Sequence, residues 1–282
     1  MSQLRQKGLS LRRSCALCRI SRSSYGYESY ESSLERVQSD RDLSQRLHHI
    51  AKRRPRYGYR RAHALLRREG HLINQKRVRR LWKQEKLTLP QRRPRRRRAA
   101  KPEKWLYAAA RPHHVWTYDF VQDKCNQGHR LRFLTITDEF TRQSLAVVTA
   151  TSIRSAQVLE VLSRLFVQHG APQYLRSDNG PEFVSQAVQQ WLREQGVQTV
   201  YIEPGCPWQN GYAESFHSRF RDECLNREWF HNVREARVVV EAWRKYYNQQ
   251  RPHSSLNYLT PVEFAARWQK QQEPQHTPAM AH

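Results

Sequence analysis

Three acidic side chains have the types and the spacing that metal-dependent chemistry requires. Asp119 lies in Val115-Trp116-Thr117-Tyr118-Asp119-Phe120, an aromatic and β-branched run typical of a buried strand, where an uncompensated charge is costly. Asp178 lies in Arg176-Ser177-Asp178-Asn179-Gly180, and Glu214 follows in Asn210-Gly211-Tyr212-Ala213-Glu214, with 35 residues between the two acids. Because hard cations such as Mg²⁺ take oxygen ligands and few protein carboxylates, these three acids are candidate metal ligands.

The chemistry of such a site follows from its charge. Three carboxylates brought together from two strands and a helix would raise one another's pKa unless a cation neutralised them. Two divalent ions about 4 Å apart stabilise the attacking and leaving oxygens of an in-line displacement at phosphorus, and they activate either water or a DNA 3′-hydroxyl. A site of this kind can therefore both cut and join a phosphodiester.

Other polar residues near these motifs are weaker candidates. Asp138 and Glu139 occupy a turn after a strand, where solvated acids are ordinary, so we leave them out of the metal site. His217, one helical turn after Glu214, is a candidate ligand or phosphate contact, although a partly buried structural histidine is the favoured interpretation. Arg221 lies on nearly the same helix face as Glu214 and is a candidate DNA contact near the scissile bond; a surface pairing with Asp222 or Glu228 is the alternative.

The charge of the chain is strongly positive and unevenly distributed. The 282 residues carry a net charge of +25. Residues 1–110 hold 31 Lys and Arg against 8 Asp and Glu, a net charge of +23, whereas residues 111–282 hold 19 against 17, a net charge of +2. Such a field predicts a polyanionic partner and binding that weakens steeply with salt. A ribosomal-type or solubilising basic tail is the alternative, but helical patterning in residues 40–88 argues against it.

Length, cysteines and hydropathy restrict the class of protein further. The chain is long enough for one core domain of about 150 residues and a smaller module. No run of 18 apolar residues and no secretory signal is present, so we expect a cytosolic, nucleoid-associated protein. The five cysteines fit reduced thiols. Cys15 and Cys18 form a Cys-x-x-Cys without a second pair, so two cysteines on a helix packing face are favoured over zinc.

Residues 40–89 predict a helix-turn-helix module. Leu43, Leu47 and Ile50 mark one helix that stops before Pro55. A second helix ends near Gly70, and Asn74 is the expected N-cap of a third that carries Val78, Leu81 and Trp82. The third helix exposes basic residues that suit a major groove and its phosphates, and the candidate DNA contacts are Lys76, Arg79, Arg80 and Lys83. A small bundle with a solvated basic face is the alternative.

Segments on either side of this module are less regular. Residues 1–39 read as a basic helical segment, with a short helix at Leu11–Cys18 and a second element that begins among the serines. Residues 90–110 read as a basic linker that tracks a DNA backbone or lies in a minor groove; a flexible spacer is the alternative. The candidate DNA contacts in this arm are Arg92, Arg93, Arg95, Arg96, Arg97 and Arg98.

Residues 111–268 predict an α/β domain. Strands over residues 115–122, 130–137 and 143–150, with turns between them, predict an antiparallel meander. Helix and strand patterns then alternate over residues 153–169, 174–178, 183–195 and 197–202. Helices over residues 209–226 and 233–247 follow, and residues 269–282 read as a disordered tail.

The motifs together resemble those of a known family. The ordered Asp119, Asp178 and Glu214, with a basic Arg221 after the Glu, resemble the DDE core of retroviral integrases and insertion-sequence transposases. The further motifs at residues 57–60, 74–78, 176–180 and 247–253 are similar to those in the second reading frame of IS3-family transposases. The resemblance covers roughly residues 10–266, and it implies an RNase H-like integrase catalytic core.

The resemblance also implies roles and partners. Asp119 would bridge two Mg²⁺ ions, for which Mn²⁺ can substitute, and Asp178 and Glu214 would each hold one of them. Asn179 and Gly180 would form a tight turn that approaches a phosphate. The implied activity is nicking of insertion-sequence ends and transfer of the 3′-hydroxyl to another phosphodiester, by a homo-oligomer on double-stranded terminal inverted repeats and target DNA.

Two alternatives to this function remain open. One is a DNA-binding regulator of transposition with an inactive core; the intact carboxylates favour the enzyme. The other is an RNA-cleaving hydrolase, which leaves the helix-turn-helix pattern unexplained. The chain has no sustained heptad run, whereas full-length relatives are commonly fusions with an upstream frame that supplies a leucine zipper. An upstream-frame partner or fusion segment is therefore expected to contribute to end recognition.

Overall fold

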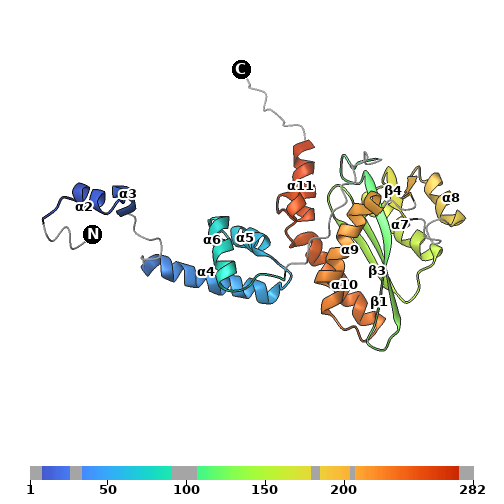
Figure 1. Ribbon diagram of the computed structural model, residues 1–282. Helices are drawn as coiled ribbons and strands as arrows, with labels where there is room; N and C mark the ends of the chain where they lie inside the picture. The colour runs from blue at the N-terminus through green and yellow to red at the C-terminus, as the bar shows by residue number, and fades with distance from the viewer. Residues whose placement is uncertain (1–7, 26–33, 91–106, 179–184, 204–206, 273–282) are drawn as a thin grey trace, which may run out of the picture. The chain divides into compact units, whose positions relative to one another are not determined.

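The computed structural model describes residues 8–25, 34–90, 107–178, 185–203 and 207–272. The chain divides into two compact units, residues 1–91 and 92–282 (Figure 1). The first unit is helical in its described parts, whereas the second combines a sheet with helices.

The first unit contains the predicted helix-turn-helix. Its described helices are α2 (Leu11–Leu17), α3 (Arg22–Tyr25), α4 (Leu34–Arg53), α5 (Tyr59–Arg68) and α6 (Gln75–Gln84). Helix α4 ends before Pro55 as predicted, but it begins before Asp40, so the expected boundary at residues 39 and 40 lies inside a helix. Asn74 caps α6 as predicted, because its side chain accepts a hydrogen bond from the backbone N–H of Lys76 at 2.8 Å.

One apolar core joins α4, α5 and α6. The predicted apolar residues of α4 and α6 lie in this core, together with residues of α5. The core includes Leu43, Leu47 and Ile50 from α4, Ala62 and Leu66 from α5, and Val78, Leu81 and Trp82 from α6. With the apolar side of α6 buried in this core, its basic side faces outward.

The second unit is built on a five-stranded mixed sheet. The strands are β1 (Val115–Lys124), β2 (Arg130–Asp138), β3 (Ser144–Ala150), β4 (Tyr174–Ser177) and β5 (Gln198–Tyr201). Their order in the sheet is β3-β2-β1-β4-β5. Strands β1, β2 and β3 form the predicted antiparallel meander, and β4 and β5 continue the sheet in parallel from β1.

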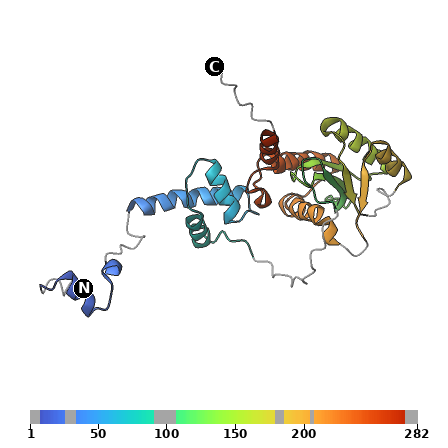
Figure 2. The same cartoon turned by 90° about the horizontal axis from the view of Figure 1, so that it is seen from above.

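Helices cover both faces of this sheet (Figure 2). The covering helices are α7 (Ser155–His169), α8 (Gln186–Glu194), α9 (Gly211–Glu223) and α10 (Val233–Gln249). Helix α11 (Pro261–Gln272) contacts α10. Short 3₁₀ turns η1 (Pro207–Asn210) and η2 (Leu225–Arg227) flank α9, and η3 (Ser254–Leu256) follows α10. Helices α7 and α8 pack on one face around Trp116 and Leu134, whereas α9 and α10 pack on the other around Phe133 and Phe220.

Some predicted boundaries differ from the observed ones. Helix α9 is shorter than the expected 209–226, because η1 and η2 form its two flanks. Helix α11 continues to Gln272, so the expectation of a disordered tail from residue 269 is wrong for residues 269–272. Residues 273–282 and the start predicted for α8 at Phe183 lie outside the described residues.

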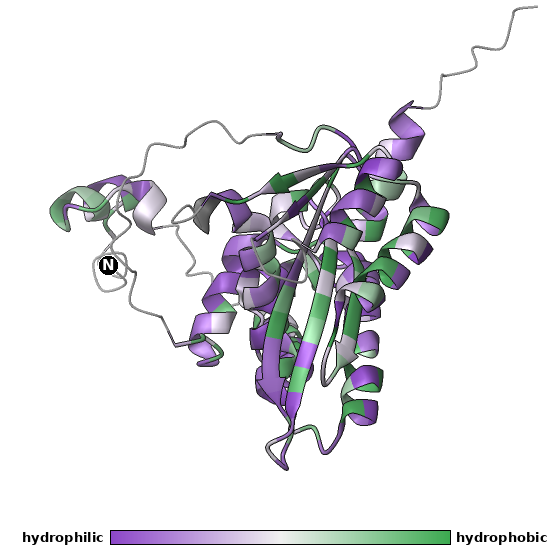
Figure 3. Ribbon diagram, turned by 90° about the vertical axis from the view of Figure 1, so that its right-hand side faces the viewer, coloured by the Kyte–Doolittle hydropathy of each residue, from purple (hydrophilic) through white to green (hydrophobic). Residues whose placement is uncertain are grey.

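The alternation of side chains along β1 sets the position of Asp119. Trp116 and Tyr118 face α7 and α8, whereas Val121 faces α9 and α10. Since successive strand residues point to opposite faces, Asp119 shares the face of Val121. Figure 3 shows stretches of hydrophobic residues along the strands with hydrophilic residues among them. The first predicted carboxylate therefore faces the helix that carries Glu214.

Candidate active site

Asp119 is largely buried and held by two hydrogen bonds. Its side chain is 17% exposed. Oδ1 accepts the backbone N–H of Phe120 at 2.6 Å, and Oδ2 accepts Nδ2 of Asn210 at 3.1 Å. The residue lies opposite Thr135 in the antiparallel register of β1 and β2. The carboxylate is therefore fixed by its own strand and by the residue before α9.

The register of β1 and β4 brings Asp178 to the same place in the sheet. Thr117 and Arg176 are partners in this parallel pair. Asp119 and Asp178 each lie two residues farther along, so the alternation of side chains directs both toward one face. Asp178 comes directly after β4 and is exposed.

Glu214 approaches this face from α9. It lies in the first turn of the helix and is exposed. Burial raises the pKa of Asp119 to about 6, and the negative charges of Asp178 and Glu214 contribute to the rise. The hydrogen bonds from Phe120 and Asn210 oppose it. The structure thus brings the three predicted carboxylates into one electrostatically coupled region.

This region has the chemistry of a divalent cation site, although its ligands are not gathered. Among the described residues, no group of three or more His, Cys, Asp or Glu side chains is close enough to hold a metal ion. The donor set nevertheless fits Mg²⁺, because it consists of carboxylate oxygens on neighbouring elements. Burial, with a smaller contribution from the charges of Asp178 and Glu214, raises the pKa of Asp119, and a bound cation would favour its ionised form.

His217 forms part of the wall around Asp119. The hydroxyl of Thr135 donates to the backbone carbonyl of Asp119 at 3.0 Å, so it accepts from Nε2 of His217 at 2.8 Å. Nδ1 of His217 then carries the lone pair, and it lies 3.8 Å from Oδ2 of Asp119. Burial, together with the charge of Arg221, lowers the pKa of His217 to about 4. The histidine is partly buried, as predicted, and neutral near pH 7.

Asp138 and Glu139 are buried, so the prediction that they are solvated is wrong. They are 0% and 1% exposed. Asp138 accepts hydrogen bonds from the backbone and hydroxyl of Thr141 and closes the turn after β2. Glu139 accepts from Nε of Arg176 at 2.8 Å, and Arg176 is itself 2% exposed. Both acids have structural partners, and Glu139 secures the strand that leads to Asp178.

Arg221 extends from α9 to the sheet. One of its guanidinium nitrogens, Nη2, donates to the backbone carbonyl of Gln122 at 2.9 Å, and the side chain is exposed. Arg221 thus has a backbone partner on the sheet. Contact of Arg221 with DNA stays a prediction.

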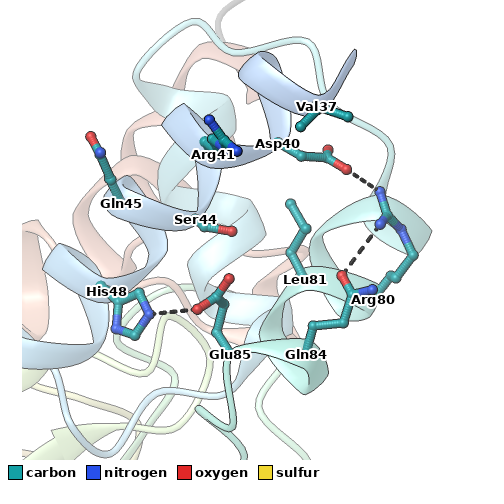
Figure 4. Close-up of a pocket in the computed structure, with 10 residues that line it drawn as sticks. All are labelled: Val37, Asp40, Arg41, Ser44, Gln45, His48, Arg80, Leu81, Gln84 and Glu85. Carbon is teal, nitrogen blue, oxygen red and sulfur yellow. Dashed lines mark hydrogen bonds and ion pairs between the residues drawn. The ribbon is translucent and has the colours of Figure 1, made fainter. Parts of the chain in front are cut away.

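The outward face of α6 carries three of the four predicted DNA contacts in exposed positions. They are Lys76, Arg79 and Lys83. Arg80 turns toward α4 instead, where it forms an ion pair with Asp40 and donates to Gln84 at 3.3 Å (Figure 4). A pair between His48 and Glu85, 2.9 Å apart, links the same two helices in Figure 4. Arg80 is thus engaged within the protein.

Some predicted DNA contacts lie outside the residues that the structure describes, and the prediction for one cysteine is wrong. Asn179, Gly180 and the arginines of residues 92–98 lie outside the described residues. Cys15 is buried but Cys18 is exposed, so the prediction that both pack against a helix neighbour is wrong for Cys18. Within the described ranges no helix is long and apolar enough to span a membrane.

Comparison with known proteins places the chain in a family. The model described as "Integrase core domain" matches residues 109–207, a second model of that description matches residues 195–261, and an "HTH-like domain" matches residues 38–95. An uncharacterized 31.7 kDa protein of insertion element IS407 from Burkholderia multivorans is 42% identical over 268 residues, which cover 95% of each chain. The transposase InsD of element IS2 from Escherichia coli is 31% identical over 80% of this chain and 78% of InsD. The chain belongs to the IS3 family of transposases.

Membership in this family confirms the predicted fold class and the broad activity. The transposase has an RNase H-like integrase core, preceded by a helix-turn-helix module. Such a core is that of a polynucleotidyl transferase-type enzyme. Among solved structures, the integrase catalytic core domain of HTLV-2, in complex with magnesium, matches with a TM-score of 0.42 and 16% identity, over 56% of this chain and 99% of that one. The simian T-cell lymphotropic virus intasome matches with a TM-score of 0.46 and 15% identity, over 62% and 58% of the two chains.

Two residues around Asp119 were missed in the sequence of this transposase. Asn210 and Thr135 both lie far from Asp119 in the chain, so no local pattern pointed to their contacts. A signal for Asn210 was present, because it lies four residues before Glu214, a separation that places two side chains on one face where a helix continues. Thr135 required the register of β1 and β2, which a sequence pattern does not define.

Proposed function

We propose that this transposase cuts insertion-sequence ends and joins them to target DNA with Asp119, Asp178 and Glu214 as its catalytic carboxylates. The observation that carries the proposal is the hydrogen bond from Asn210, four residues before Glu214, to Asp119, because it brings the start of α9 to β1. The register of β1 and β4 supports a shared site for Asp119 and Asp178, because each lies two residues after the paired residues Thr117 and Arg176.

Each carboxylate has a distinct task in this proposal. Two Mg²⁺ ions, or Mn²⁺ in their place, would stabilise the attacking and leaving oxygens of an in-line displacement at phosphorus. Asp119, which is largely buried, would be the ligand shared by the two ions, a role that follows from the family resemblance. Asp178 and Glu214 are exposed and would each hold one ion, which requires that both side chains turn toward Asp119 when the ions bind.

DNA binding is assigned chiefly to the basic first unit. Lys76, Arg79 and Lys83 present positive charge on one exposed side of α6, which supports contact with phosphates in or beside a major groove. The arm at residues 92–98, together with Asn179 and Arg221, is proposed to add contacts near the reacting phosphodiester. Terminal inverted repeats and target DNA are the proposed partners, with the transposase acting as a homo-oligomer on the nucleoid and with a contribution from an upstream-frame segment.

A strand-transfer assay tests this function directly. The full chain is incubated with Mg²⁺ and labelled double-stranded DNA that carries the ends of the element, and nicked and joined products are separated on a denaturing gel. We expect both products, and we expect neither when EDTA replaces Mg²⁺. Tight binding to the ends with neither product, in Mg²⁺ and in Mn²⁺, would instead support a regulator with an inactive core.

A further inference from the structure

Asn210 is a buried polar residue whose side chain reaches Asp119 from the start of α9. It is 7% exposed. Nδ2 donates to Oδ2 of Asp119 at 3.1 Å, whereas Oδ1 is buried and has no hydrogen-bond partner in the part of the chain that the structure describes. Although Asn210 precedes α9, its side chain makes no capping hydrogen bond to that helix. The amide nitrogen of Asn210 therefore has a hydrogen-bond partner, whereas its amide oxygen has none among the described residues.

The orientation of this amide follows from its neighbour. A rotation by half a turn would place Oδ1 against the carboxylate of Asp119, where two acceptors would repel each other, and it would leave Nδ2 without its acceptor. The observed orientation is therefore the favourable one. It leaves one buried carbonyl oxygen without a donor among the described residues, which is unfavourable.

The position of Asn210 in the chain links two of the proposed metal ligands. The residue ends η1 and lies four residues before Glu214, so its bond to Asp119 ties the beginning of α9 to β1. This bond limits how far the first turn of α9 can move from the sheet. Because catalytic groups need placement to about 0.5 Å, such a tie matters for how Glu214 meets Asp119.

We propose that Asn210 is a positioning residue of the metal site: Nδ2 holds the carboxylate of Asp119, and Oδ1 accepts a hydrogen bond from a water molecule carried by the bound divalent cation. The inference rests on the proposed function, because it requires a cation at Asp119. Mg²⁺ loses its water reluctantly and keeps several water molecules when bound. These water molecules can donate a hydrogen bond to the buried Oδ1 of Asn210.

Binding of Mn²⁺ to the full chain tests the proposal without reference to activity. The free ion gives an EPR signal that falls when it is bound, so a titration yields the affinity of each variant. Asn210→Leu removes both polar ends at similar volume, and Asn210→Ala removes them without a steric clash if the leucine variant fails to fold. The matched control is Asn226→Leu, at an exposed asparagine in η2.

We expect Asn210→Leu and Asn210→Ala to weaken Mn²⁺ binding about 10-fold, as removal of groups that orient metal ligands commonly does, and Asn226→Leu to bind as the unaltered chain does. If Asp119→Asn loses Mn²⁺ but both Asn210 variants bind normally, the inference about Asn210 is overturned while the metal site stands. If Asp119→Asn itself binds Mn²⁺ normally, the metal site is wrong and the role of Asn210 fails with it.

Discussion

Arg251 and Glu223 form a buried ion pair with two hydrogen bonds. Nε and Nη2 of the arginine donate to the two carboxylate oxygens at 2.6 and 2.7 Å, and the residues are 2% and 8% exposed. Glu223 ends α9, the helix that carries Glu214, and Arg251 follows α10. The pair therefore fixes the far end of the catalytic helix to the turn at residues 251–253.

Loss of one partner of this pair should destabilise the second unit strongly. We expect Arg251→Met to lower the free energy of unfolding by about 3–5 kcal/mol, because Glu223 would remain buried with its charge uncompensated. The double variant Arg251→Met with Glu223→Leu should recover much of the loss. Urea unfolding measures both, with the exposed Arg227→Met as the control. A loss below about 1 kcal/mol, the size typical of a surface pair, would show that the pair contributes little.

The charge of Asp119 should make the protein without metal less stable above pH 6. Its pKa rises from the ordinary 3.8 to about 6 in the folded chain, so the folded state binds this proton more tightly than the unfolded state does. Below pH 4 both states are protonated and the group has little effect; above pH 6 both are ionised and the full penalty of about 3 kcal/mol applies. The contribution of Asp119 to stability therefore falls as pH rises from 4 to 6.

Asp119→Asn should remove this penalty. In EDTA we expect the variant to be more stable than the unaltered chain above pH 6, by up to about 3 kcal/mol, with the difference vanishing toward pH 4. Asp123→Asn is a matched control, because Asp123 lies on the same strand and also accepts the N–H of the following residue. Thermal unfolding at several pH values measures this difference in stability. If Asp119→Asn were more stable than the unaltered chain by the same amount at every pH, the ionisation of Asp119 would not be the cause.

The exposed face of α6 should govern the salt dependence of DNA binding. Replacement of Lys76, Arg79 and Lys83 by Ala is expected to reduce the slope of log K against log salt by up to about 0.9 for each lost phosphate contact. Arg80→Ala should reduce it less, because Arg80 is engaged with Asp40. Binding to labelled double-stranded DNA at several salt concentrations gives the slopes. A slope unchanged by the triple replacement would assign α6 a purely structural role.

Local patterns predicted the elements of this transposase well where the burial of one face dominates. Strand-forming runs separated by turn signals gave the three strands of the meander, and the apolar stripe with Asn74 gave α6. Patterns failed where tertiary contacts decide. Polar residues after β2 read as a solvated turn, yet Glu139 is buried because Arg176, which is far from it in the chain, supplies the compensating charge.

The candidate site, too, could be predicted from the sequence only in part. The types and order of Asp119, Asp178 and Glu214 could be read from the sequence, but the features that hold them could not. The contacts from Asn210 and Thr135 to Asp119, and the pair of Arg251 with Glu223, join residues that are distant in the chain. Such contacts depend on strand register and helix packing, which no periodic pattern encodes.

The most direct test of the proposed site measures strand transfer by Asp119→Asn, Asp178→Asn and Glu214→Gln, with DNA binding measured in parallel. We expect each replacement to lower nicking and joining by at least about 100-fold in Mg²⁺ and in Mn²⁺, while DNA binding stays unchanged. The control variants Asp123→Asn and Glu228→Gln should keep full strand-transfer activity. Substantial strand transfer by any one of the three variants would contradict the assignment of that carboxylate.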